Sequence, residues 1–242
     1  MVRLTRRDSG ADGKVRKKGS VFSMSETKVT VKADSHAARK MMLIRLAVCA
    51  ILTSMAVTLM YFEFPLPFMP PFLKFDFSEL PVLFGTFALG PLWGIVIELL
   101  KNLIHLPATA TMGIGEFSNF LTGSIFVGTA GLVYRKMRTR PGVALSVVVG
   151  TLALAVIAVP VNAYITLPLY ASAMGFSTEA IIDMCTSVNP LVKDKLSLLL
   201  AVFVPFNLIK GFGVGLWAFL IYLPLKRFVN MLYDKTHKKA EK

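Results

Sequence analysis

The stretch FEFPLPFMPPFLKFDFSELP, from Phe62 to Pro81, determines how the rest of the chain can be arranged. It is rich in aromatic and apolar residues, which is unusual for a loop exposed to water. Its inner prolines rule out a regular helix, because proline has no backbone N–H and biases the preceding residue toward extended backbone; they are Pro65, Pro67, Pro70 and Pro71. We therefore expect a rigid loop that folds back over a site between membrane-spanning helices.

The apolar runs between residues 41 and 228 are long enough to form membrane-spanning helices. Each is continuous and reaches about 20 residues, the length that crosses a bilayer as a helix, whereas strands of a membrane barrel alternate. The chain has 242 residues, 55% of them hydrophobic, and a mean hydropathy of +0.63. The sequence predicts an all-α, multi-pass protein of the cell membrane. The cysteines do not resemble a disulfide pair and the histidines lack ligand spacing, so no metal site is predicted.

Both ends of the chain are polar and basic, and the net charge is +13. We expect residues 1–40 to form a disordered cytoplasmic tail, because they include few large apolar residues and no helical stripe. Residues 229–242 are expected to form a basic cytoplasmic C-terminal tail. By its charge alone, the basic N-terminal segment could also bind nucleic acid. A cytoplasmic flank that orients the first helix and favours anionic lipid is the better interpretation, so no nucleic-acid partner is predicted.

Charge placement decides whether residues 80–106 form one span or two. Gly90-Pro91 lies in the middle of this run, and a basic cluster at 135–140 follows the next span. The positive-inside rule places that cluster and both termini in the cytoplasm only if the chain turns at Gly90-Pro91. The domain 41–228 is therefore predicted to have six transmembrane helices, with short second and third helices at 79–90 and 91–106. The other spans are expected at about 42–61, 117–134, 143–170 and 196–225, and the outward-facing segments 62–78, 107–115 and 171–195 can meet above one bundle.

Lys210 is the clearest ionisable residue at membrane depth, where a charge costs about 2.5–3.5 kcal/mol on insertion scales. It lies in FVPFNLIKGFG, and Asn207 shares its helix face three residues earlier. The fifth span repeats the Pro-x-Asn pattern, with Asn162 in the place of Asn207. Two proline-loosened helices that each present an asparagine predict a shared polar pocket. The alternative is that Lys210 only pairs with an intramembrane carboxylate, Glu98 or Glu116.

Other polar and small residues have structural interpretations. Glu98, Lys101 and Asn102 have the i, i+3, i+4 spacing that lets them satisfy one another on one helix. We expect Glu116 to favour the N-terminus of the fourth span by its charge. The small residues Ala50, Ser54 and Thr58 recur at four-residue spacing and let another helix approach closely, whether in the bundle or in a partner.

Motifs of soluble enzyme chemistry are missing from the sequence. It lacks G-x-x-x-x-G-K-[ST], so it does not bind ATP through the usual phosphate loop. It also lacks HExxH and GxSxG. An intramembrane enzyme is therefore the weaker class.

The chain resembles the riboflavin-specific substrate-binding (S) component of energy-coupling factor (ECF) transporters over about 41–228. The segments that carry the resemblance are, in order, FEFPLPFMPPFLKFDFSELP, GTFALGPLWGIVIELLKNLIHL, GIGEFSNFLTG and PFNLIKG. The resemblance implies a six-helix protein that binds riboflavin from the outer side beneath its first loop. It also implies assembly with a transmembrane coupling protein and two ATP-binding subunits. The first helix would contact the coupling protein through small residues, here Ala50 and Ser54; residues 1–40 have no counterpart in the family.

The resemblance also assigns binding residues. Asn207 and Lys210 match the Asn-x-x-Lys of the last helix, and Asn162 matches the asparagine of the fifth. A carboxamide can meet the flavin's pyrimidine edge with both a donor and an acceptor, and Lys210 can donate to a carbonyl of that edge. The ring would rest on Leu73 and Phe75.

Backbone groups near Gly113 would bind the ribityl hydroxyls. The sequence thus predicts an S component for riboflavin uptake that is not an enzyme. It predicts no cofactor, since riboflavin is the transported ligand. Two alternatives remain: an S component for FMN or another vitamin, or an intramembrane enzyme acting on a lipid or prenyl group.

Overall fold

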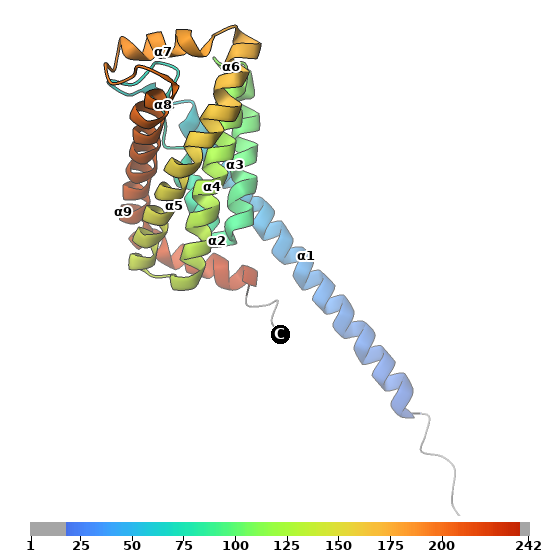
Figure 1. The fold of residues 1–242 in the computed structure, drawn as a ribbon. Coiled ribbons are helices and arrows are strands. Elements are labelled where there is room, and N and C mark those ends of the chain that lie inside the picture. The colour runs from blue at the N-terminus through green and yellow to red at the C-terminus, as the bar shows by residue number, and fades with distance from the viewer. Residues whose placement is uncertain (1–17, 238–242) are drawn as a thin grey trace, which may run out of the picture. The chain divides into compact units, whose positions relative to one another are not determined.

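The computed structural model describes residues 18–237 and is almost entirely helical (Figure 1). Within this part of the chain, four helical segments are long and apolar enough to cross a membrane: Ala38–Met60, Ile114–Met137, Arg140–Met174 and Lys195–Pro224. The helical membrane class predicted from the continuous apolar runs is therefore correct.

Helix α1, Lys18–Met60, begins well inside the segment that we expected to be disordered. The expectation for residues 1–17 lies outside the described residues, and over 18–40 the structure differs from it. The apolar span supplies a helix nucleus, and each residue added to a nucleus gains a hydrogen bond without a new nucleation cost. Contacts divide the chain after Leu43, and the bundle described below belongs to the second unit.

The predicted turn at Gly90-Pro91 is present. Helix α2, Glu79–Leu89, ends there and α3, Pro91–His105, begins with proline in its first turn. Gly90 has φ 106° and ψ 166°, a region of backbone space that is essentially restricted to glycine. Residues 80–106 therefore form two short helices rather than one span.

The Pro-rich stretch forms a small β-hairpin. Strands β1, Phe64–Pro65, and β2, Lys74–Phe75, pair antiparallel, with Phe64 opposite Phe75. The hairpin ends before Ser78, which precedes α2. The non-helical geometry predicted from the prolines is present.

The remaining helices complete the bundle. After η1, Leu106–Ala108, come α4, Ile114–Met137, and α5, Arg140–Val161, which continues through η2, Asn162–Thr166, into α6, Leu167–Met174. Helix α7, Thr178–Thr186, lies across one end of the bundle (Figure 1). The last helical segment comprises α8, Lys195–Leu198, η3, Leu199–Phe203, and α9, Val204–His237. The expected C-terminal tail is thus helical to residue 237, and 238–242 lie outside the described residues.

Two of these segments, η2 and η3, are π-helical, and each lies just before a proline. η2 ends two residues before Pro168, and η3 ends two residues before Pro205. In each, the N–H that follows the segment donates to a carbonyl five residues earlier, from Leu167 to Asn162 and from Val204 to Leu199. Single π-helical turns inside α-helices often occur at functional sites.

Candidate functional site

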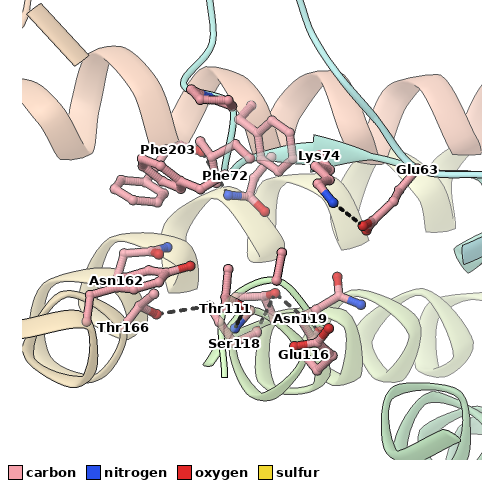
Figure 2. A pocket seen from close by; sticks show the side chains of 18 of the residues that line it. Glu63, Phe72, Lys74, Thr111, Glu116, Ser118, Asn119, Asn162, Thr166 and Phe203 are labelled. Atoms are coloured by element: carbon pink, nitrogen blue, oxygen red, sulfur yellow. Dashed lines mark hydrogen bonds and ion pairs between the residues drawn. The ribbon is translucent and has the colours of Figure 1, made fainter. Parts of the chain in front are cut away.

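A cavity of about 450 Å³ opens between the hairpin, α4, η2 and α9 (Figure 2). All three segments predicted to face outward contribute to its lining. The residues they supply include Glu63 and Phe72–Lys74 from the first, Ala110 and Thr111 from the second, and Phe176, Ile181 and Met184 from the third. The site therefore lies where these loops meet the helices, as the topology predicts.

Asn162 and Asn207 both line the cavity and are bound to their helices in the same way. The Nδ2 of Asn162 donates to the carbonyl of Ala158 at 2.8 Å, and that of Asn207 to the carbonyl of Phe203 at 2.8 Å. Both side chains are buried. Each carboxamide keeps an oxygen and a second N–H for a ligand, so the predicted pair of asparagines shares one pocket.

Lys210 also lines the cavity, at the junction of four elements. Its Nζ donates to Asn119 Oδ1 at 2.6 Å, and it lies 3.5 Å from Asp76 Oδ2 and 3.7 Å from Glu79 Oε1. The carboxylates that neutralise it therefore come from the end of the hairpin and the start of α2. The alternative that Lys210 pairs with Glu98 or Glu116 is wrong, because other groups hold those two carboxylates.

Glu98 belongs to a second buried group centred on Lys101. The Nζ of Lys101 lies 2.8 Å from Glu79 Oε1 and 3.0 Å from Glu98 Oε2, and all three side chains are almost completely buried. The Nδ2 of Asn102 donates to Glu98 Oε1 at 2.9 Å. The predicted i, i+3, i+4 arrangement is therefore present, but Glu79 joins it and connects it to Lys210.

Glu116 lies in the first turn of α4, as predicted from its charge. Its Oε1 is 3.1 Å from His105 Nδ1, and its Oε2 accepts from Thr109 Oγ1 at 2.7 Å. Both carboxylate oxygens are thus held by the segment that precedes α4. Glu116 also borders the cavity, where Figure 2 labels it beside Asn119.

Of the apolar bed predicted from sequence, Leu73 lines the cavity and Phe75 does not. The two side chains of strand β2 point to opposite faces, so Lys74 lines the cavity while Phe75 belongs to the core. Phe75 is 5% exposed and packs edge-on against Phe77 at 5.1 Å between ring centroids.

Gly113 is likewise outside the lining, which includes its neighbours Thr111 and Gly115 instead. It precedes α4 with φ 83° and ψ −4°, a left-handed conformation that suits glycine. Its backbone N–H donates to Thr109 Oγ1 at 3.0 Å. Gly113 therefore shapes the turn into α4 rather than facing a ligand.

Several residues of the lining were not assigned to the site from sequence. On α4, Ser118, Asn119 and Thr122 face the cavity, and Ser118 Oγ accepts from Thr166 Oγ1 at 3.0 Å. The signal for this face was the spacing of its polar residues: Glu116, Asn119 and Thr122 recur three residues apart, and Ser118 lies four residues before Thr122. The lining also includes the aromatic residues Phe72, Tyr170, Phe203 and Phe206.

Both lysines of the lining are paired with carboxylates. Lys74 pairs with Glu63 across the hairpin, and Lys210 with Asp76 and Glu79. Burial by itself raises the pKa of Asp76. The ammonium groups of Lys210 and Lys101 and hydrogen bonds from Ser78 outweigh burial and hold that pKa below its ordinary value. Among the described residues, the arrangement suits a largely uncharged molecule that carries hydrogen-bonding groups.

The family model for the substrate-specific component of ECF transporters matches residues 44–222. The chain belongs to this family. Membership makes it a transporter component and not an intramembrane enzyme, and it agrees with the resemblance found in the sequence.

Individual proteins of known function or structure are similar to this chain over most of its length. The riboflavin transporter RibU of Staphylococcus aureus (strain TCH60) is 29% identical over 188 residues, which cover 78% of this chain and 93% of the relative. The riboflavin transporter FmnP of Bacillus subtilis (strain 168) is 29% identical, with 77% and 94% covered. RibU of Streptococcus thermophilus is 34% identical, with 78% and 85% covered. A solved S component of a bacterial ECF transporter matches this S component with a TM-score of 0.56 and 31% identity, covering 76% of this chain and 96% of that one.

Proposed function

We propose that this S component binds riboflavin in the cavity between the hairpin, α4, η2 and α9, and delivers it across the membrane. The observation that carries the proposal is the convergence of Asn162, Asn207 and Lys210 on one cavity. The relatives named as riboflavin transporters support the same ligand. A volume of about 450 Å³ falls within the ~300–1,000 Å³ of typical small-molecule sites.

The pyrimidine edge of the flavin is proposed to face the asparagines. That edge has two carbonyls on either side of an N–H, and the free oxygen and N–H of each carboxamide can meet it. Lys210 uses part of its donor capacity on Asn119 and Asp76, and its remaining N–H can donate to a flavin carbonyl. The ring system is proposed to rest among Phe72, Leu73 and Phe203, the apolar part of the lining.

The polar groups around Thr111, Gly115 and Glu116 are proposed to receive the ribityl chain. They replace Gly113 in this role because they line the cavity and it does not. Hydroxyl groups can donate to the carboxylate of Glu116 and accept from Thr111. FMN carries a phosphate group, and both lysines of the lining are already paired with carboxylates. We therefore expect riboflavin to bind more tightly than FMN.

In the membrane, we propose six transmembrane segments, formed by α1, α2, α3, α4, α5–α6 and α8–α9; α2 and α3 have only 11 and 15 residues, so one or both of them do not cross fully. The basic residues at the α4–α5 turn and on the last part of α9 then lie in the cytoplasm with both termini, and the cavity opens outward. The exposed face of α1 with Ala50 and Ser54 is available to the transmembrane coupling protein, which would act with two ATP-binding subunits. Ordinary packing inside the bundle does not account for this face, because both side chains are exposed.

Titration of the purified protein with riboflavin, FMN and an unrelated vitamin tests the proposal. Riboflavin is expected to bind with quenching of its fluorescence and to leave the protein yellow. FMN should bind more weakly, and the unrelated vitamin should not compete. Preferential binding of the unrelated vitamin, or no binding of any flavin by folded protein, would contradict the proposal.

A further inference from the structure

Asn189 joins the outer wall of the cavity to the helix that carries Asn207 and Lys210. It lies between α7 and α8, and its Nδ2 donates to the backbone carbonyl of Ala201 at 3.3 Å. That carbonyl belongs to η3. In an α-helix it would accept from residue 205, which here is Pro205 and has no N–H. Asn189 thus gives a side-chain donor to a carbonyl that an α-helical register would leave without one.

Asn189 is also bound tightly to its own loop. Its Oδ1 accepts from the N–H of Leu191 at 3.1 Å, and its backbone N–H donates to the carbonyl of Cys185 at 2.8 Å. Cys185 lies on α7, whose Ile181 and Met184 line the cavity. A path of hydrogen bonds therefore runs from α7 through Asn189 to η3.

The segment that Asn189 contacts determines how α9 presents its side chains. A π-helical turn accommodates one extra residue, which rotates the preceding helix by about 100° relative to the following one. Phe203 ends η3, lines the cavity, and accepts the hydrogen bond from Asn207 through its carbonyl. A change in η3 would therefore reach the carboxamide of Asn207.

We propose that Asn189 is a positioning residue for ligand binding. By satisfying the Ala201 carbonyl it holds α7 against the last helix, which keeps the outer wall closed and slows ligand release. Asn189 is absent from the cavity lining and so acts through other residues. For riboflavin as the ligand, this inference rests on the proposed function.

The substitution Asn189→Asp removes the Nδ2 donor and keeps an acceptor for the Leu191 N–H, and it places a charged oxygen opposite the Ala201 carbonyl. Riboflavin release, followed by the recovery of flavin fluorescence, is expected to be about two- to tenfold faster, the range for one lost hydrogen bond. The association rate should change little. Ser187→Ala is the matched control: its hydroxyl donates to the Met184 carbonyl at 2.7 Å in the same loop, and release should stay at the wild-type rate.

Cys185 gives a readout that needs no flavin. Its thiol is fully buried, and burial raises its pKa to about 11, so alkylation requires the wall to open. In a Cys49→Ala background it is the sole thiol of the chain. Asn189→Asp should label several-fold faster than the background protein. Faster labelling in a protein that binds no riboflavin would refute the proposed function and leave the positioning role standing.

Pro205→Ala decides between positioning through η3 and a general loosening of the loop. It restores a backbone N–H that can donate to the Ala201 carbonyl, so adding Asn189→Asp should then change neither labelling nor release. Wild-type behaviour of Asn189→Asp alone, or the same effect with and without Pro205→Ala, would overturn the proposal. If Asn189→Asp does not fold, recovery of folded protein by Pro205→Ala supports the proposal, and no recovery overturns it.

Discussion

Replacing Lys210 with methionine separates its charge from its proposed contact with the flavin. The side chain is 7% exposed and holds Asn119, Asp76 and Glu79. Methionine is unbranched and apolar, so Asp76 loses its main counter-charge while the volume is nearly kept. Removing one partner of a buried ion pair costs about 3–5 kcal/mol. Because Lys101 remains beside Glu79, we expect the free energy of unfolding to fall by about 3 kcal/mol.

The double variant Lys210→Met with Asp76→Asn restores the balance of charge. We expect it to regain most of the lost stability, measured as the thermal unfolding of purified, ligand-free protein. Riboflavin affinity should remain at least about 1 kcal/mol weaker than wild type, because the donor to the flavin carbonyl is still missing. Lys74→Met is the matched control, since its pair with Glu63 is partly exposed and such pairs contribute about 0–1 kcal/mol.

Two results would refute this account. Wild-type affinity in the single variant would remove Lys210 from the binding site. Recovery of both stability and affinity in the double variant would mean that Lys210 only neutralises Asp76 and does not contact the ligand.

The same variant has a pH signature. The pKa of Asp76 is below its ordinary value of 3.8, so the ionised carboxylate stabilises the fold above that pH. The contribution is lost as pH falls through the folded-state pKa. Without the positive charge of Lys210, less counteracts the effect of burial, so the pKa of Asp76 rises. The acid-side fall in the unfolding temperature should therefore occur at higher pH in Lys210→Met than in wild type.

Three further predictions concern other parts of the protein. Asn162→Leu and Asn207→Leu should each weaken riboflavin binding by about 1 kcal/mol or more in a fluorescence titration, and unchanged affinity in both would disprove the proposed contact with the pyrimidine edge. Replacing Pro70 and Pro71 with glycine should speed release in a stopped-flow chase, because the loop then loses more entropy on closing; an unchanged rate would make the hairpin a fixed connector. Ala50→Trp should abolish co-purification with the coupling protein while riboflavin binding persists, and normal co-purification would place the interface elsewhere.

The helices were predictable because their signals are local. The charge pattern and Gly90 located the turn between α2 and α3, and the repeated Pro-x-Asn identified Asn162 and Asn207. The partners of Lys210 were not predictable, since Asp76 lies 134 residues away in the chain and no local spacing links the two. Their contact depends on how the hairpin folds back, which the prolines restrict but do not specify.

The hairpin also explains the misplacement of Phe75. A hydrophobic side chain in an apolar loop can face either a ligand or the core, and the sequence pattern does not distinguish these. Strand alternation from Lys74 does, but the strand is only two residues long. Gly113 itself does not line the cavity, because its left-handed backbone conformation forms the turn before α4; its neighbours Thr111 and Gly115 do line it.

The buried charges have a consequence for biogenesis. Glu79, Glu98 and Lys101 are on α2 and α3, which are synthesised before α9, the helix that carries Lys210. Until α9 is made, the α2–α3 pair carries one more negative than positive charge. An unpaired charge at membrane depth costs about 2.5–3.5 kcal/mol. The order of synthesis thus favours an assembly in which α2 and α3 settle into the bilayer only after α9 has been inserted, and a chain truncated before Lys210 should be a substrate for membrane quality control.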